Sequence, residues 1–135
     1  MSAPPEVVKV VRQWVEKAEE DFRTAEHMLL LDESCPHGIV CFHAQQCVEK
    51  YLKALLVLHG VPFPKIHDLL ELLPLLPKTV VLGVQAADVA ELNRYVVEGR
   101  YPGEWEPITG REAGHAVDMA RRVREAARKH LMKST

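Results

Sequence analysis

Residues 41–56 read CFHAQQCVEKYLKALL, and their pattern predicts one amphipathic helix. Apolar side chains recur at steps of three and four residues, which places them in one stripe along a helix. The members of this stripe are Val40, Ala44, Cys47, Val48, Tyr51, Leu55 and Leu58. Another side carries Gln46, Glu49 and Lys53 in one row, flanked by His43 and Lys50. We expect this polar row to be a surface that binds something polar or anionic, because its positions avoid the apolar stripe.

Helical signals continue on both sides of this stretch and predict an all-α chain. A first helix, from about Glu6 to Leu31, has its apolar side chains within one arc. The members of this arc are Val7, Val8, Val11, Trp14, Val15, Ala18, Phe22, Ala25 and Leu29. The short break at residues 32–36 favours an antiparallel neighbour. The stripes of the first two helices should therefore meet in a hairpin.

Turn and cap residues divide the rest of the chain. Gly60 is suited to end the second helix. Two shorter helices are predicted at about residues 67–73 and 84–98, and Thr109, with a glutamate three residues later, is suited to begin the last one, which runs to about Met132. We predict one domain over residues 1–135, an antiparallel up-and-down bundle of four to five helices.

The bulk composition narrows the functional classes. A net charge of −2 offers no general basic field for nonspecific nucleic-acid binding, so a nucleotide or RNA site has to be local. The three cysteines form no Cys-x-x-Cys pair and the histidines have no ligand spacing, so we expect no metal and no cofactor. No apolar run is long enough for a membrane span, and the N-terminus has no signal core. We expect a cytoplasmic protein with reduced thiols.

Four segments, in this order, resemble the HEPN domain family. They read WVEKAEED at residues 14–21, CFHAQQCVEKYLKALL at 41–56, KIHDL at 65–69 and RYP at 100–102. The resemblance covers nearly the whole chain, and the second segment is the most specific. It implies a small helical bundle, usually dimeric and often encoded beside a minimal nucleotidyltransferase. It also implies an association with nucleotide or RNA binding, with toxin–antitoxin pairs and, in some branches, with metal-independent RNA cleavage.

The cleaving branches of that family use an arginine and a histidine separated by four to six residues. The arginine stabilises a phosphate and the histidine moves a proton. Arg124 and His130 have five residues between them and match this spacing. Six steps on one helix, however, leave them about 120° apart and about 9 Å along the axis. We keep this pair as an alternative catalytic site and expect no appreciable RNA cleavage.

Several other polar residues each have two possible roles. Arg124 interrupts the apolar face of the last helix, either as a side chain that snorkels near the helix end or as an arginine that faces a groove or a second subunit. His67 and Asp68 open the third helix, where they form an N-cap or the mouth of a groove. Arg100 and Tyr101 suit stacking on a base or packing of their loop against the bundle.

Three functional hypotheses follow. The first, which we favour, is a non-enzymatic module that binds a nucleotide or phosphorylated ligand, or that partners a nucleotidyltransferase, in a toxin–antitoxin pair. The second is a metal-independent endoribonuclease toxin. The third is a structural adaptor whose polar rows pair across a homo-oligomer, most simply a two-fold dimer. The residues expected to bind the ligand or partner are Gln46, Glu49, Lys50, Lys53, His67, Asp68, Arg100 and Tyr101.

Overall fold

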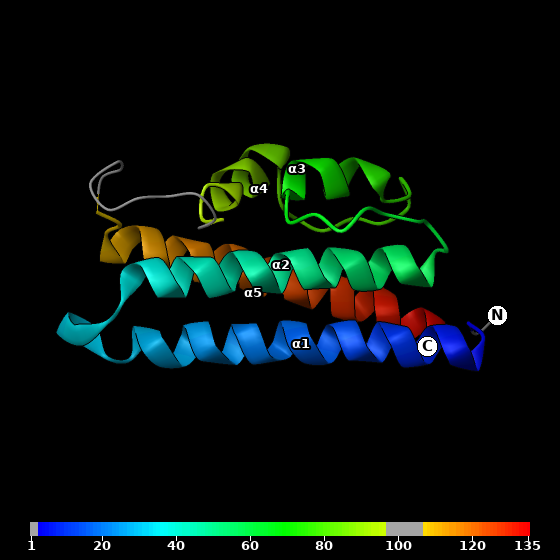
Figure 1. The fold of residues 1–135 in the computed structure, drawn as a ribbon, viewed down its shortest axis with the longest axis horizontal. Coiled ribbons are helices and arrows are strands. Elements are labelled where there is room, and N and C mark those ends of the chain that lie inside the picture. Colours follow the sequence, from blue (N-terminus) through cyan, green and yellow to red (C-terminus); the bar gives the residue numbers. More distant parts are fainter. Residues whose placement is uncertain (1–2, 97–106) are drawn as a thin grey trace.

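The computed structural model describes residues 3–96 and 107–135. Three long helices run along the molecule, and two short helices lie together on one side of them (Figure 1). The long helices are α1 (Pro5–Leu29), α2 (His37–Leu58) and α5 (Gly110–Ser134). The short ones are α3 (Leu69–Leu72) and α4 (Ala86–Asn93), and two 3-10 turns complete the set, η1 (Asp32–Ser34) and η2 (Leu73–Leu75). No strand occurs in the described residues, so the all-α prediction is confirmed.

The helices alternate in direction along the chain (Figure 1). α1 is antiparallel to α2, the segment that carries α3 and α4 returns along α2, and α5 then runs parallel to α2. The fold is therefore the predicted up-and-down bundle, with its third member broken into two short helices. No helix in the described part of the chain is long and apolar enough to cross a membrane.

α2 lies at the centre of this bundle and touches α1, α5, α3 and α4. Its predicted apolar stripe is buried, apart from Leu58 at its end, which is partly buried. The matching stripe of α1 packs against it through Val11, Ala18, Phe22 and Ala25. Gln45, Glu49 and Lys53 of α2 are also buried, with 0%, 2% and 5% exposure. The prediction that Glu49 and Lys53 lie on an open surface is therefore wrong. A central helix has neighbours on several sides, so its polar row is covered as well.

The end of α2 shows how the sequence stops a helix locally. Gly60 adopts a φ of +67°, which a residue without a Cβ reaches at no steric cost. The N–H of Val61 then donates to the carbonyl of Leu56 at 2.9 Å, and that of Gly60 to Val57 at 3.1 Å. These two bonds form a Schellman motif, so the predicted cap at Gly60 is confirmed.

The other boundaries differ from prediction by a few residues. α1 ends at Leu29 rather than Leu31, since the chain turns into η1. α3 covers only four residues because a proline, Pro74, lies in the 3-10 turn that follows. α4 begins later than expected, behind a capping box made by Gln85 and Asp88.

Candidate functional site

Glu49 and Lys53 form a covered ion pair on α2. Lys53 Nζ donates to Glu49 Oε2 at 3.1 Å, and the other carboxylate oxygen lies 2.9 Å from His67 Nδ1. The lysine ammonium also lies 5.3 Å from the ring centroid of Trp14 and 5.8 Å from that of Phe63. The charge of Lys53 is thus compensated inside the protein rather than presented to a phosphate.

Gln45 completes this cluster and was missed in the sequence. Its amide donates to the backbone carbonyl of His67 at 3.0 Å, and Gln46 Nε2 donates to Gln45 Oε1 at 2.7 Å. The side chain of His67 is half exposed and that of Gln46 is partly buried, so the cluster meets solvent at these two residues. A signal existed: a second apolar row, made by Cys41, Leu52 and Leu56, runs beside the polar row on the same helix.

Lys50 belongs to a different cluster, which faces α1. Its ammonium pairs with Asp21 Oδ2 at 2.5 Å, and His43 Nδ1 lies 2.8 Å from Asp21 Oδ1. Asp21 is only 7% exposed, so one buried carboxylate joins two side chains of α2. The candidate ligands on α2 are therefore divided between two internal clusters.

Asp68 acts as a cap in this structure. Its Oδ1 accepts from the N–H of Leu70 at 2.9 Å and from Asn93 Nδ2 at 2.8 Å. Asn93 Oδ1 accepts in turn from the N–H of Leu69 at 2.9 Å. This network holds α3 against α4 and supports the capping interpretation of Asp68. Arg100 and Tyr101 lie outside the described residues.

Glu19 is a second residue that the sequence analysis missed. It forms a bidentate pair with Arg124, with Nε–Oε2 and Nη2–Oε1 distances of 2.7 Å each. Tyr51 donates its hydroxyl to Oε2 and Arg128 donates from Nη1 to Oε1, both at 2.8 Å. The pairing with Arg124 holds the pKa of the Glu19 carboxyl below its usual value of 4.5. Arg124 also lies 4.9 Å from the Phe22 ring centroid, so its guanidinium packs against α1 within the bundle.

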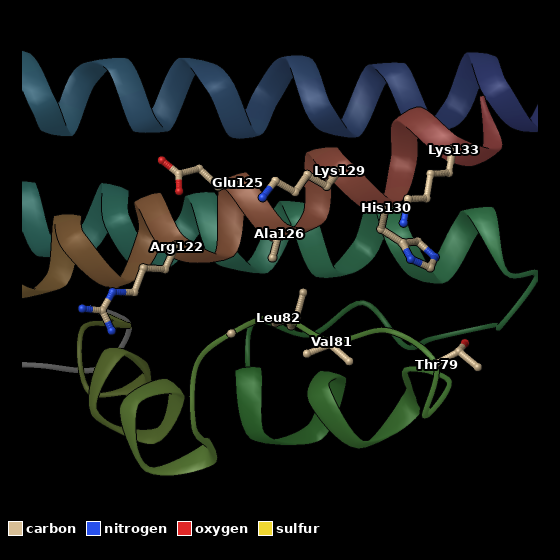
Figure 2. A pocket seen from close by; sticks show the side chains of 10 residues that line it. Thr79, Val81, Leu82, Arg122, Glu125, Ala126, Lys129, His130 and Lys133 are labelled. Atoms are coloured by element: carbon tan, nitrogen blue, oxygen red, sulfur yellow. The ribbon is translucent and has the colours of Figure 1, made fainter.

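An open pocket of about 570 Å³ lies between α5 and the segment 79–83 (Figure 2). Its lining residues are Thr79, Val81, Leu82, Gly83, Arg122, Glu125, Ala126, Lys129, His130 and Lys133. The volume lies in the range of small-molecule sites. Figure 2 shows Arg122 toward one end of the pocket, and His130 and Lys133 toward the other. Of these residues the sequence analysis had singled out only His130.

His130 meets a second histidine at its end of the pocket. Its Nε2 lies 2.9 Å from Nε2 of His59, which is the C-cap residue of α2. Burial, and then the charges of His59 and Lys133, lower the pKa of His130 below its usual value of 6.5. Arg124 has its partner on α1 and His130 has its partner on α2. The two side chains of the alternative catalytic pair thus have different neighbours.

Metal ligands do not gather in the part of the chain that the structure describes. Among residues 3–96 and 107–135, no three histidine, cysteine, aspartate or glutamate side chains group as they would around a metal ion. The polar groups at the pocket on α5 are cationic side chains, one carboxylate and His130, which contacts His59.

Three kinds of similarity place the chain among known proteins. The HEPN domain family matches residues 11–130. The crystal structure of TT1696 from Thermus thermophilus superposes with a TM-score of 0.71 at 30% identity, covering 88% of this chain and 96% of that one. ST0689, described as an archaeal HEPN homologue, shares the fold with a TM-score of 0.65 at 24% identity, over 90% of this chain and 97% of that one.

A shorter match connects the chain to a named protein of Methanocaldococcus jannaschii. "Putative toxin MJ1304" is 39% identical over 56 residues, which are 42% of this chain and 35% of that protein. The match thus spans about a third of that relative's length. Because the family matches residues 11–130 and a structure with 30% identity superposes over 88% of the chain, the chain belongs to the HEPN domain family.

Proposed function

We propose that this HEPN domain binds a nucleotide or another phosphorylated ligand and that it works with a nucleotidyltransferase in a toxin–antitoxin pair. The observation that carries the binding is the pocket on α5, where Arg122, Lys129 and Lys133 line one space. Charge-assisted hydrogen bonds from such side chains are the usual means of holding phosphate. The pocket is also large enough for a mononucleotide.

The pocket is a better candidate than the polar row of α2. Glu49 and Lys53 are buried and paired with each other, so releasing them would cost more than a phosphate contact returns. Lys129 and Lys133 are exposed and form no ion pair within the described residues. They can therefore meet an anion without breaking an existing contact. Arg122 is held by Asp118 at 3.3 Å and is the more constrained cation.

Family membership and the name of one relative support the toxin–antitoxin part of the proposal. Among the described residues, Arg124 and His130 have separate partners, and a HEPN domain without a converging arginine–histidine pair would act through binding rather than through cleavage. The nucleotidyltransferase is the partner expected from the resemblance. Its engagement is tested separately from ligand binding, because the two can fail independently.

Calorimetric titration with AMP tests the binding. The double change Lys129→Ala with Lys133→Ala should weaken AMP binding at least about tenfold, since each charged hydrogen bond contributes about 1.5–3 kcal/mol. A matched control, Lys9→Ala with Lys17→Ala, removes the same charge from exposed positions of α1 and should leave the affinity within about twofold. An equal loss in both variants would show that only net charge matters. Absence of AMP binding to the wild-type chain would reject the pocket as a nucleotide site.

A further inference from the structure

His130 lines one end of the pocket, and its ring meets that of His59, which caps the end of α2. His59 lies at the end of α2 and His130 near the end of α5, with ring centroids 5.0 Å apart and Nε2 atoms at 2.9 Å. At this distance one ring donates its N–H to the lone pair of the other, so the contact requires at least one neutral imidazole. The pair is therefore sensitive to any charge placed beside it.

His130 faces different groups on each side. From α2 it meets His59, and from its own helix Lys129 and Lys133 lie one residue before it and three after it. Glu125 lines the pocket further along α5. The segment 79–83 contributes the hydroxyl of Thr79 and apolar groups, and none of its lining residues titrates. The surroundings of His130 within the pocket are thus predominantly cationic.

We propose that this end of the pocket holds a terminal phosphate group, a phosphate monoester, and that His130, in contact with His59, is its proton-linked ligand. The inference rests on the proposed function, that the pocket takes a phosphorylated ligand. Lys133 and the protonated His130 ring supply two positive charges at this end, which match a monoester with a charge of about −1.5 to −2. An internal phosphodiester has a single negative charge and leaves these two cations partly uncompensated. The hydroxyl of Thr79 adds a neutral donor opposite them.

Proton linkage follows from the sign of the local charges. Positive neighbours and burial keep the free His130 ring neutral at pH 7, because its pKa lies below the usual value. A bound anion offsets these positive charges and favours the imidazolium. Ligand binding at pH 7 should therefore take up a proton from solvent. The protonated His130 ring then donates to a phosphate oxygen in place of the histidine–histidine contact.

Two measurements on the full chain test the proposal. Calorimetry of AMP binding at pH 7 in two buffers of different ionisation enthalpy should show net proton uptake by the wild type. His130→Gln keeps a polar side chain and should reduce this uptake to nearly zero. His115→Gln, at an exposed histidine of α5 beside Glu91, is the matched control and should leave it unchanged. AMP should also bind about tenfold tighter than the dinucleotide ApA, whose only phosphate is a diester.

The outcomes separate this inference from the proposed function. Proton uptake that persists in His130→Gln, or equal affinity for AMP and ApA, would overturn the assignment of His130 while leaving nucleotide binding intact. If the wild type binds neither ligand, the proposed function fails and the inference fails with it. Circular dichroism of each variant, compared with the wild type, confirms that the readouts report binding rather than loss of the fold.

Discussion

At the scale of single residues, Glu49 shows how burial changes the role of a polar side chain. On the sequence it belongs to a polar row that repeats over two helical turns. In the structure its carboxylate is 2% exposed and is held by Lys53 and His67. A buried charge is tolerated only when it is paired and hydrogen-bonded. The Glu49–Lys53 pair therefore stabilises the fold, and removing one partner should lower the free energy of unfolding.

The substitution Lys53→Met tests this role. It leaves Glu49 without its ammonium partner, and breaking a buried pair in this way costs about 3–5 kcal/mol of the free energy of unfolding. Urea denaturation of the variant and the wild type measures the difference. Lys17→Met removes the exposed pair with Glu20, whose side chains are 66% and 57% exposed, and should change stability by less than about 0.5 kcal/mol. A similarly small effect of Lys53→Met would mean that the Glu49 cluster is solvated.

At the scale of helices, Glu19 ties the three long elements together. It lies on α1 and accepts hydrogen bonds from Tyr51 on α2 and from Arg124 and Arg128 on α5. Its position is four residues after Val15 and three before Phe22, so it lies beside the edge of the apolar arc of its own helix. The isolated Arg124 on the facing side of α5 explains why a carboxylate is accommodated there. Glu19 and Arg124 are each a charged residue beside apolar ones in the sequence, and in the structure they pair with each other.

Acid sensitivity should report on this contact. Because the folded-state pKa of Glu19 lies below 4.5, its ionised form stabilises the fold at pH values above that number, and the stabilisation is lost as pH falls through the folded-state pKa. Glu19→Gln should therefore lower the free energy of unfolding at pH 7 by about 1.5–3 kcal/mol, and it should flatten the decline of stability below pH 4.5. Urea midpoints measured from pH 7 to pH 3 give both quantities. Glu20→Gln, at the exposed neighbour, should keep the wild-type profile, and parallel profiles for the two variants would contradict the role of Glu19.

At the scale of the whole molecule, the exposed apolar side chains bear on assembly. The described surface exposes Leu30, Leu31 and Ile39 near the turn between α1 and α2, with 74%, 51% and 45% exposure. Isolated apolar side chains on a surface are common, so these residues do not define an interface by themselves. The expectation of a homo-oligomer rests on the family resemblance and on the general frequency of two-fold dimers.

Sedimentation at micromolar concentration and native mass spectrometry test this expectation. We expect twice the mass of one chain, and an added complex when the nucleotidyltransferase partner is present. A monomer of 15.3 kDa in both experiments would contradict the homo-oligomer. Loss of the homo-oligomer on addition of the partner would show instead that the two associations compete for one surface.

The helices and their ends could be predicted because their signals are local. The stripe of α1, the Schellman cap at Gly60 and the N-cap at Thr109 all depend on residues within a few turns of each other. Thr109, for example, accepts from the N–H of Glu112 at 3.1 Å, as its spacing indicates. Such features depend on neighbouring residues in the sequence and not on how the helices pack.

The roles of the polar residues depended on segments that are distant in the chain. Lys53 is covered by Phe63 and Trp14, which reach it from two other elements, and Glu49 by His67. The pocket likewise forms where the segment 79–83 meets α5, about forty residues later. Helical periodicity states which side chains share a face, but whether that face meets water or another helix depends on tertiary packing. For this reason the bundle was predictable from its sequence, whereas the candidate binding site emerged from the arrangement of the helices.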